Sequence, residues 1–98
     1  MIERDYTLTL YELYKNLLTE KQKMYFEEYY YEDLSMQETA DNHKVSKAYV
    51  GKIINETVKK LIKYEELLHI NSKNESLRKI ANTLNEELKE KIENIIEN

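Results

Sequence analysis

Apolar side chains recur at helical spacing along most of the chain, and this pattern predicts a protein built of helices alone. The first stripe has members at i, i+4, i+7, i+8 and i+11, which places them on one face of an α-helix. Its members are Tyr6, Leu10, Leu13, Tyr14 and Leu17. The stripe therefore predicts a first helix over residues 6–17, with this face turned toward the core.

Two capping boxes mark the starts of the next helices. In a capping box, a Ser or Thr and a Glu or Gln three residues later satisfy each other's backbone N–H groups. Thr19 with Gln22 predicts the start of a second helix, which we expect to end near residue 31. Ser35 with Glu38 predicts a short third helix, residues 36–42.

A helix-turn-helix is indicated by residues 35–56, because a short helix, a tight turn and a longer helix follow one another there. Ser46 is an N-cap candidate for the longer helix, which we expect over residues 47–68. Ala40 is small where two crossing helices approach closely, and Val45 can fill the turn at 42–44. Such a motif presents one exposed helix face to a groove of duplex nucleic acid.

The C-terminal segment, residues 71–98, has a different character. Polar residues at 71–74 interrupt the pattern and can cap a new helix, after which apolar residues recur to the end. Five of them have a heptad-like spacing: Leu77, Ala81, Leu84, Leu88 and Ile95. One helix cannot bury this stripe alone. We expect it either to pack back on a domain formed by residues 1–70 or to pair with a second chain, and we favour a homodimer through these five residues.

Composition narrows the class of protein. The chain has 98 residues, 35% of them charged, no Pro and no Cys, which is typical of one small helical domain without disulfides or thiolate metal sites. No apolar run is long enough for a membrane span or a signal peptide, so we expect a cytoplasmic protein without membrane insertion. No nucleophile, Gly-rich loop or metal signature accompanies the carboxylates, so we expect no enzyme and no cofactor.

Charge is distributed unevenly along the chain. The net charge is −4, but residues 36–63 carry six basic and three acidic side chains. Residues 1–35 carry four basic and eight acidic side chains, and residues 64–98 carry five and eight. The helix-turn-helix therefore lies in the only positive third, which favours a basic face on an acidic body.

Candidate nucleic-acid-binding residues follow from the exposed positions expected in the motif. Lys47 and Lys52 would reach phosphates or guanine edges, and Asn55 could pair with adenine. The full candidate set is Lys44, Ser46, Lys47, Tyr49, Lys52, Asn55 and Lys59. Ala48 and Gly51 complete the expected exposed face. No Arg is among these candidate positions, so a phosphate-led mode fits better than strict base reading, and the alternative is a merely solvated face.

Other polar and aromatic groups have plainer interpretations. The nine Tyr residues could stack on unpaired bases, but their helical spacing favours a core; Tyr49 is compatible with either. His43 and His69 are too far apart for a metal site, and we expect surface or capping roles. Glu27, Glu28, Glu32 and Asp33 could form a patch for a basic partner, but we favour a solvated face.

Four motifs carry a resemblance to a known family: LLTEKQ at 17–22, YYYEDLSMQETA at 29–40, VSKAYV at 45–50 and KYEELLH at 63–69. Residues 8–70 resemble the YlxM-type helix-turn-helix proteins of low-G+C Gram-positive bacteria and mollicutes. LLTEKQ followed by an acidic turn and S-x-x-E-x-A also resembles the opening of sigma factor region 4. The resemblance implies an all-α, sigma region 4-like helix-turn-helix bundle, here with an added C-terminal helical segment.

The same resemblance implies a functional context. Family members are linked by gene neighbourhood to the signal recognition particle, which implies its RNA or its GTPase as a partner. Two positions depart from the family. The family usually has Gly in the turn, where this chain has Lys44, and a left-handed backbone costs a non-Gly residue about 1 kcal/mol. It usually has a bulky polar or aromatic residue where this chain has Gly51.

Three functional hypotheses remain open at this point. The first is a nucleic-acid-binding accessory of the signal recognition particle pathway, with DNA or the particle's RNA as ligand. The second is a protein-interaction accessory of the particle's GTPase. The third is a DNA-binding transcription regulator. The fold alone does not separate them.

Overall fold

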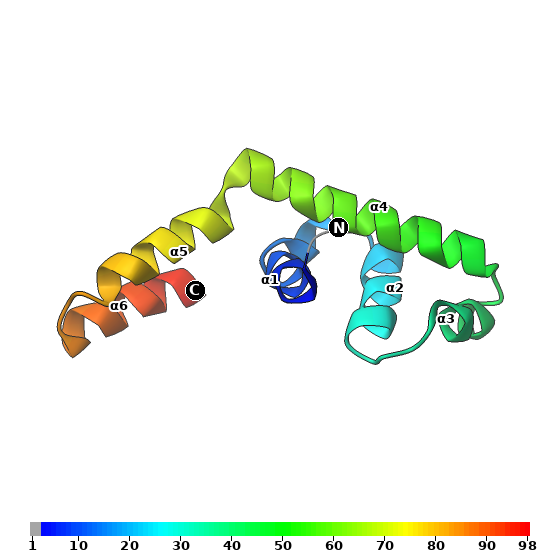
Figure 1. The fold of residues 1–98 in the computed structure, drawn as a ribbon, viewed down its shortest axis with the longest axis horizontal. Helices are drawn as coiled ribbons and strands as arrows, with labels where there is room; N and C mark the ends of the chain where they lie inside the picture. Colours follow the sequence, from blue (N-terminus) through cyan, green and yellow to red (C-terminus); the bar gives the residue numbers. More distant parts are fainter. Residues whose placement is uncertain (1–2) are drawn as a thin grey trace. The chain divides into compact units, whose positions relative to one another are not determined.

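The described residues form helices joined by short loops, as the sequence predicts. A computed structural model describes residues 3–98, which contain no strand. The helices are α1 (Arg4–Tyr14), the 3-10 helix η1 (Lys15–Leu17), α2 (Glu20–Tyr30), α3 (Met36–His43), α4 (Lys47–Leu68), α5 (Ile70–Ala81) and α6 (Glu86–Glu97). They form two compact units, Met1–Leu67 and Leu68–Asn98 (Figure 1).

Both predicted capping boxes are present. The Thr19 side chain accepts a hydrogen bond from the Gln22 N–H at 3.2 Å, and the Gln22 side chain accepts one from the Thr19 N–H at 3.0 Å. Ser35 and Glu38 repeat this arrangement at 3.0 and 2.9 Å. α2 and α3 therefore begin where the sequence places them, because each start is determined by neighbouring residues.

The prediction of which residues of the first helix face the core is partly wrong. α1 ends at Tyr14, and residues 15–17 form the tighter η1. Because a 3-10 helix has 3.0 residues per turn instead of 3.6, it rotates the side chains that follow Tyr14. Leu17 is 53% exposed and Tyr6 is 37% exposed, whereas Tyr11 and Leu18 are buried.

Two apolar clusters hold the first unit together, and α4 contributes to both. The first cluster joins α1, α2 and α4 through Leu10, Tyr11, Tyr14, Leu18, Phe26 and Leu61. The second joins α2, α3 and α4 through Tyr25, Ala40, Val50 and Ile54. α4 thus runs the length of the unit, and α1, α2 and α3 pack along one side of it (Figure 1). The prediction that Tyr residues form the core is confirmed for Tyr11, Tyr14 and Tyr25.

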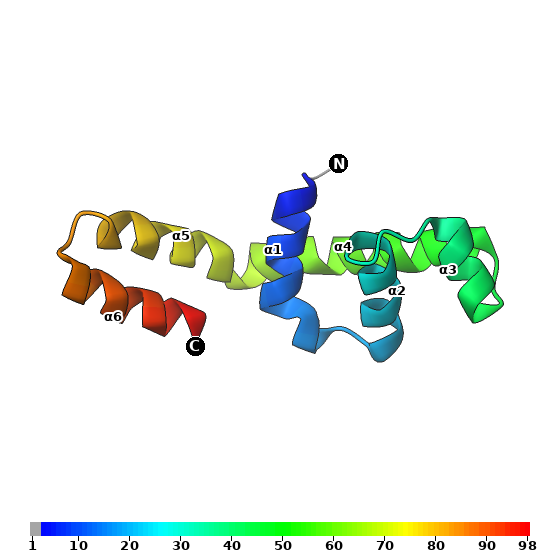
Figure 2. The same cartoon turned by 90° about the horizontal axis from the view of Figure 1, so that it is seen from below.

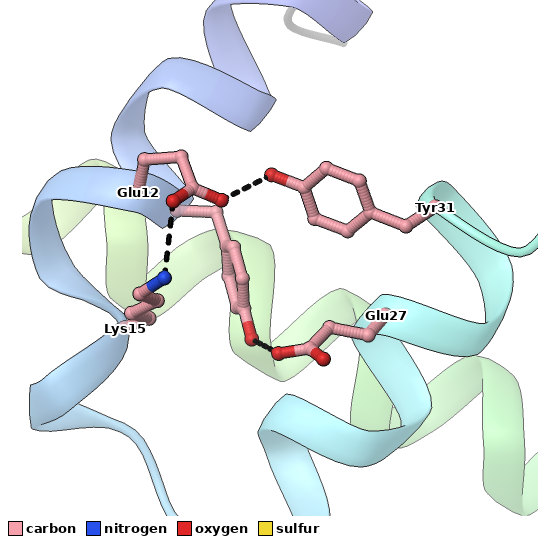
Figure 3. Close-up of polar contacts among 5 residues, drawn as sticks. Glu12, Lys15, Glu27 and Tyr31 are labelled. Carbon is pink, nitrogen blue, oxygen red and sulfur yellow. Dashed lines mark hydrogen bonds and ion pairs between the residues drawn. The ribbon is translucent and has the colours of Figure 1, made fainter.

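Polar contacts reinforce the junction of α1 and α2 (Figure 3). The Tyr11 hydroxyl donates to the Glu27 carboxylate, and the Tyr31 hydroxyl donates to the Glu12 carboxylate at 2.6 Å. The Lys15 ammonium lies 3.0 Å from the second oxygen of Glu12. Burial first, and then the adjacent carboxylates, raise the pKa of Tyr11 and of Tyr31.

The C-terminal unit corrects the prediction of one continuous helix after a break at 71–74. His69 has a left-handed backbone with φ 55°, and α5 begins after it and runs through the predicted break. The actual interruption is at residues 82–85, because the Asn85 side chain accepts a hydrogen bond from the Leu88 N–H at 3.0 Å and starts α6. α5 and α6 lie side by side as a hairpin (Figure 2).

Candidate nucleic-acid interface

The turn between α3 and α4 has the geometry that a helix-turn-helix needs. Lys44 adopts the left-handed conformation, with φ 55° and ψ 45°. The Val45 N–H then bonds to the Ala40 carbonyl at 3.0 Å and closes the last turn of α3. Ser46 caps α4, since its hydroxyl oxygen accepts from the Tyr49 N–H at 3.0 Å. The chain therefore uses Lys44 where a glycine would be less strained.

α3 and α4 approach each other through small residues. Ala40 is fully buried in the cluster that joins these helices. Gly51 is half-buried, and a Cβ at this position would lie 3.6 Å from the Met36 sulfur, an ordinary contact distance. The prediction that Gly51 belongs to the exposed reading face is therefore wrong, because its α-carbon faces α3.

The predicted basic residues of α4 do reach the surface. Lys47, Lys52, Asn55 and Lys59 are exposed, as is Lys44 in the turn. By helix geometry, positions 52, 55 and 59 are neighbours on one side of α4. Lys60 and Lys63, which the candidate set omits, are also exposed on α4. Their contribution to the positive charge of residues 36–63 is the sequence feature that could have identified them.

Most of this positive charge is not neutralised by the protein. Within residues 3–98, ion pairs hold four basic side chains outside the helix-turn-helix: Arg4, Lys15, Lys23 and Lys91. By contrast, none of the ion pairs among the described residues includes a lysine between residues 44 and 63. The exposed side of α4 therefore presents lysines that are available to an anionic ligand.

Tyr49 lies at the edge of this surface and is half-buried. Its ring meets the Tyr25 ring edge-on, with centroids 6.2 Å apart. Its hydroxyl accepts a hydrogen bond from the Lys21 ammonium at 3.1 Å, and this contact raises the pKa of Lys21. Lys21 comes from α2 and is absent from the candidate set, because 28 residues separate it from Tyr49.

A polar contact between α2 and α3 supports the helix-turn-helix motif. The His43 Nε2 lies 2.5 Å from the Glu28 carboxylate, and the Asn42 amide donates to the same carboxylate at 3.3 Å. The His43 ring also packs on Tyr25, with centroids 4.8 Å apart. Glu28 is buried, so the prediction that it belongs to a solvated acidic face is wrong. This contact ties α2 to the last turn of α3.

The five predicted dimer residues do not form one continuous seam. Leu77 and Ala81 lie on α5, Leu84 lies in the loop, and Leu88 and Ile95 lie on α6. Ala81 is buried, whereas the four larger residues are exposed, Ile95 by 74%. The hairpin therefore has an apolar surface, but its geometry differs from that of a heptad repeat.

Residues 3–98 contain neither a metal-binding cluster nor a membrane-spanning helix. No group of three or more His, Asp and Glu side chains is placed to hold a metal ion. No helix there combines the length and the apolar character needed to cross a membrane.

Comparison with known proteins places these features in a family. The model for "Putative helix-turn-helix protein, YlxM / p13 like" matches residues 1–98. A UPF0122 protein of Ureaplasma urealyticum serovar 10 is 37% identical over 94 residues, which cover 95% of each chain. One of Fusobacterium nucleatum is 40% identical over 90 residues, covering 91% of this chain and 87% of the relative.

A UPF0122 protein of Mycoplasma capricolum is 45% identical over 75 residues, covering 76% of this chain and 66% of the relative. A helix-turn-helix family of this kind suggests a nucleic-acid-binding, non-enzymatic regulatory protein. Because the family model covers the full sequence and the relatives align along most of it, the chain belongs to the YlxM/p13-like helix-turn-helix family.

Proposed function

We propose that this protein binds structured nucleic acid through the exposed side of α4 and the turn before it. The observation that carries the proposal is the set of exposed lysines on this surface that no described carboxylate neutralises. The contacting residues are Lys44, Ser46, Lys47, Lys52, Asn55 and Lys59, with Tyr49 at the edge. Lysine ammonium groups bind phosphates as point charges, so the contacts are mainly to the backbone of the nucleic acid.

The proposed ligand is the RNA of the signal recognition particle, and the protein is an accessory of that pathway. The resemblance to YlxM-type proteins supports this choice. The major groove of A-form RNA is too narrow for a helix, so α4 would bind through shape and phosphate contacts. The proposed contact residues include lysines but no arginine, which is compatible with that mode.

We also propose that the protein is a homodimer through the α5–α6 hairpin. Within Leu68–Asn98, which the structure describes in full, Ala81 is the only buried apolar residue. Large apolar side chains remain exposed on the hairpin: Leu77, Ile80, Leu84, Leu88 and Ile95. The hairpin carries five basic and six acidic residues, so a second copy meets little net repulsion. Two such hairpins would form a four-helix bundle.

A fluorescence titration tests the proposed ligand. The purified protein is titrated against a random duplex DNA, the signal recognition particle RNA and an unrelated structured RNA of equal length, each at two salt concentrations. Preference for the particle RNA, weakened by salt, is the expected result. Equal binding to all three would contradict the proposed specificity, and preference for the DNA would favour a transcription regulator.

Absence of binding to all three ligands would overturn the nucleic-acid proposal. The same preparation is then titrated with the particle's GTPase, because a protein-interaction accessory would bind it without nucleic acid. Binding to the GTPase alone would support that second function.

A further inference from the structure

Lys21 on the first turn of α2 lies beside the first turns of α4. Its ammonium donates a hydrogen bond to the Tyr49 hydroxyl at 3.1 Å and lies 5.5 Å from the centre of the Tyr49 ring. Tyr49 is in turn held by its edge contact with Tyr25. Lys21 is exposed, yet these contacts keep its charge in a defined place.

The partner of Lys21 is a neutral phenol and not a carboxylate, so the contact does not cancel the positive charge. Lys23, two residues further on, differs in this respect because its ammonium lies 2.9 Å from the Glu20 carboxylate. An ammonium has three donors. Tyr49 occupies one of them, and two remain for an anion.

The location of this charge relates it to the proposed interface. Tyr49 and Lys52 are three residues apart on α4 and are therefore neighbours on its surface. Lys21 contacts the Tyr49 side chain, and Lys52 lies about one helical turn from Tyr49 on α4. A nucleic-acid strand that followed the exposed side of α4 past Lys52 would therefore run toward Tyr49, which Lys21 contacts.

We propose that Lys21 is a phosphate-binding residue of the nucleic-acid interface, and that Tyr49 is the positioning residue that holds it. This inference rests on the proposed function of α4. It extends the interface from α4 to α2, so that lysines from two helices bind the backbone of one strand. Because Lys21 is already held in place, less side-chain entropy is lost when it meets a phosphate.

The test compares Lys21→Gln with Lys23→Gln in the full chain. Both variants remove one positive charge from α2, and Gln at position 21 can still donate to Tyr49. Affinity for labelled signal recognition particle RNA and for a random duplex DNA is measured over a range of salt concentrations. For Lys21→Gln we expect binding about fivefold weaker at low salt, and a slope of log affinity against log salt that is smaller by about 0.9 on the duplex. For Lys23→Gln we expect the slope of the parent protein.

Tyr49→Phe tests the positioning role separately. This variant retains the ring and every charge but removes the acceptor of the Lys21 hydrogen bond. We expect binding about twofold weaker with an unchanged salt slope, because the number of phosphate contacts stays the same. A Tyr49→Phe protein that binds as tightly as the parent would overturn the role of Tyr49.

The failure of this inference differs from the failure of the proposed function. If Lys47→Glu with Lys52→Glu prevents binding but Lys21→Gln and Lys23→Gln have the same salt slope, only the role of Lys21 is overturned. If Lys47→Glu with Lys52→Glu leaves binding unchanged, the proposed α4 surface is wrong. If the parent protein binds neither probe, both proposals fall. Circular dichroism of each variant verifies that the helices remain.

Discussion

The Tyr31 hydroxyl donates a 2.6 Å hydrogen bond to the Glu12 carboxylate, which joins the end of α2 to α1 (Figure 3). Tyr11 on α1 donates in the opposite direction, to Glu27 on α2. Each side of the junction therefore supplies one tyrosine as a hydrogen-bond donor and one glutamate as an acceptor. A phenol must be neutral to donate, and an ionised carboxylate accepts more strongly than a protonated one, so we expect this junction to respond to both acid and alkali.

Acid should weaken this junction through Glu12. The hydrogen bond from Tyr31, followed by that from Lys15, lowers the pKa of Glu12 below its ordinary value of 4.5. A lowered pKa stabilises the fold above pH 4.5, and this stabilisation is lost as the pH falls through the folded-state pKa. Tyr31→Phe should lower the free energy of unfolding by about 1 kcal/mol at neutral pH and reduce its further loss in acid.

Urea unfolding followed by circular dichroism between about pH 6 and pH 3 measures this effect. Tyr29→Phe is the control, because it removes a hydroxyl from a neighbouring half-buried tyrosine of α2. Equal acid dependence in Tyr31→Phe and the parent would contradict the assigned role of Tyr31.

Alkali should weaken the junction through its tyrosines. The pKa values of Tyr11 and Tyr31 are raised above the ordinary value of 10. A raised pKa means that the stabilisation is fully present below pH 10 and is lost as the pH rises, because the unfolded chain then ionises more readily. Tyr11→Phe keeps the ring that stacks on Phe26 and should flatten this loss. Unfolding measured above pH 10 tests the prediction, which is wrong if the variant and the parent lose stability equally.

Charge reversal on α4 should remove nucleic-acid binding. Lys47→Glu with Lys52→Glu places two negative charges on the proposed interface, and we expect affinity to fall at least tenfold at low salt with unchanged helicity. Lys73→Glu with Lys79→Glu makes the same change in total charge at two exposed positions of α5. If this control weakens binding equally, net charge and not the α4 surface explains the effect.

Leu88→Asp should prevent dimerisation. Leu88 is an exposed apolar residue of α6, and a buried aspartate would leave an unpaired charge in a four-helix bundle. Sedimentation velocity should show a dimer for the parent and a monomer for the variant. Asn94→Asp, an exposed position on the same helix, should remain dimeric. A parent protein that sediments as a monomer would refute the dimer.

Gly51→Ala should stabilise the protein by about 0.5–1 kcal/mol. Alanine loses less backbone entropy than glycine inside a helix. The added Cβ would lie at an ordinary 3.6 Å from the Met36 sulfur. Ala48→Gly, the reverse change on the exposed side of α4, should destabilise by a similar amount. Thermal unfolding of both variants measures this; a destabilised Gly51→Ala protein would show that α3 and α4 leave no room for the methyl group.

The sequence by itself determined the elements whose causes are local. The capping boxes of Thr19 and Ser35 start α2 and α3, and Ser46 caps α4, because each needs only residues within one helical turn. The left-handed conformation of Lys44 was indicated only by the family resemblance, because Gly usually occupies this position there. The exposure of Lys47, Lys52, Asn55 and Lys59 also followed from helical periodicity.

The tertiary structure decided which residues meet across the chain. η1 rotated Leu17 out of the core, and Asn85 rather than the polar residues at 71–74 divided the C-terminal segment. Lys21 reached Tyr49 because α2 and α4 pack together, although many residues separate them in sequence. Periodicity shows which side of a helix is polar, but it carries no information on which distant helix packs beside it. The α4 part of the proposed interface was therefore predictable, and its proposed extension to α2 was not.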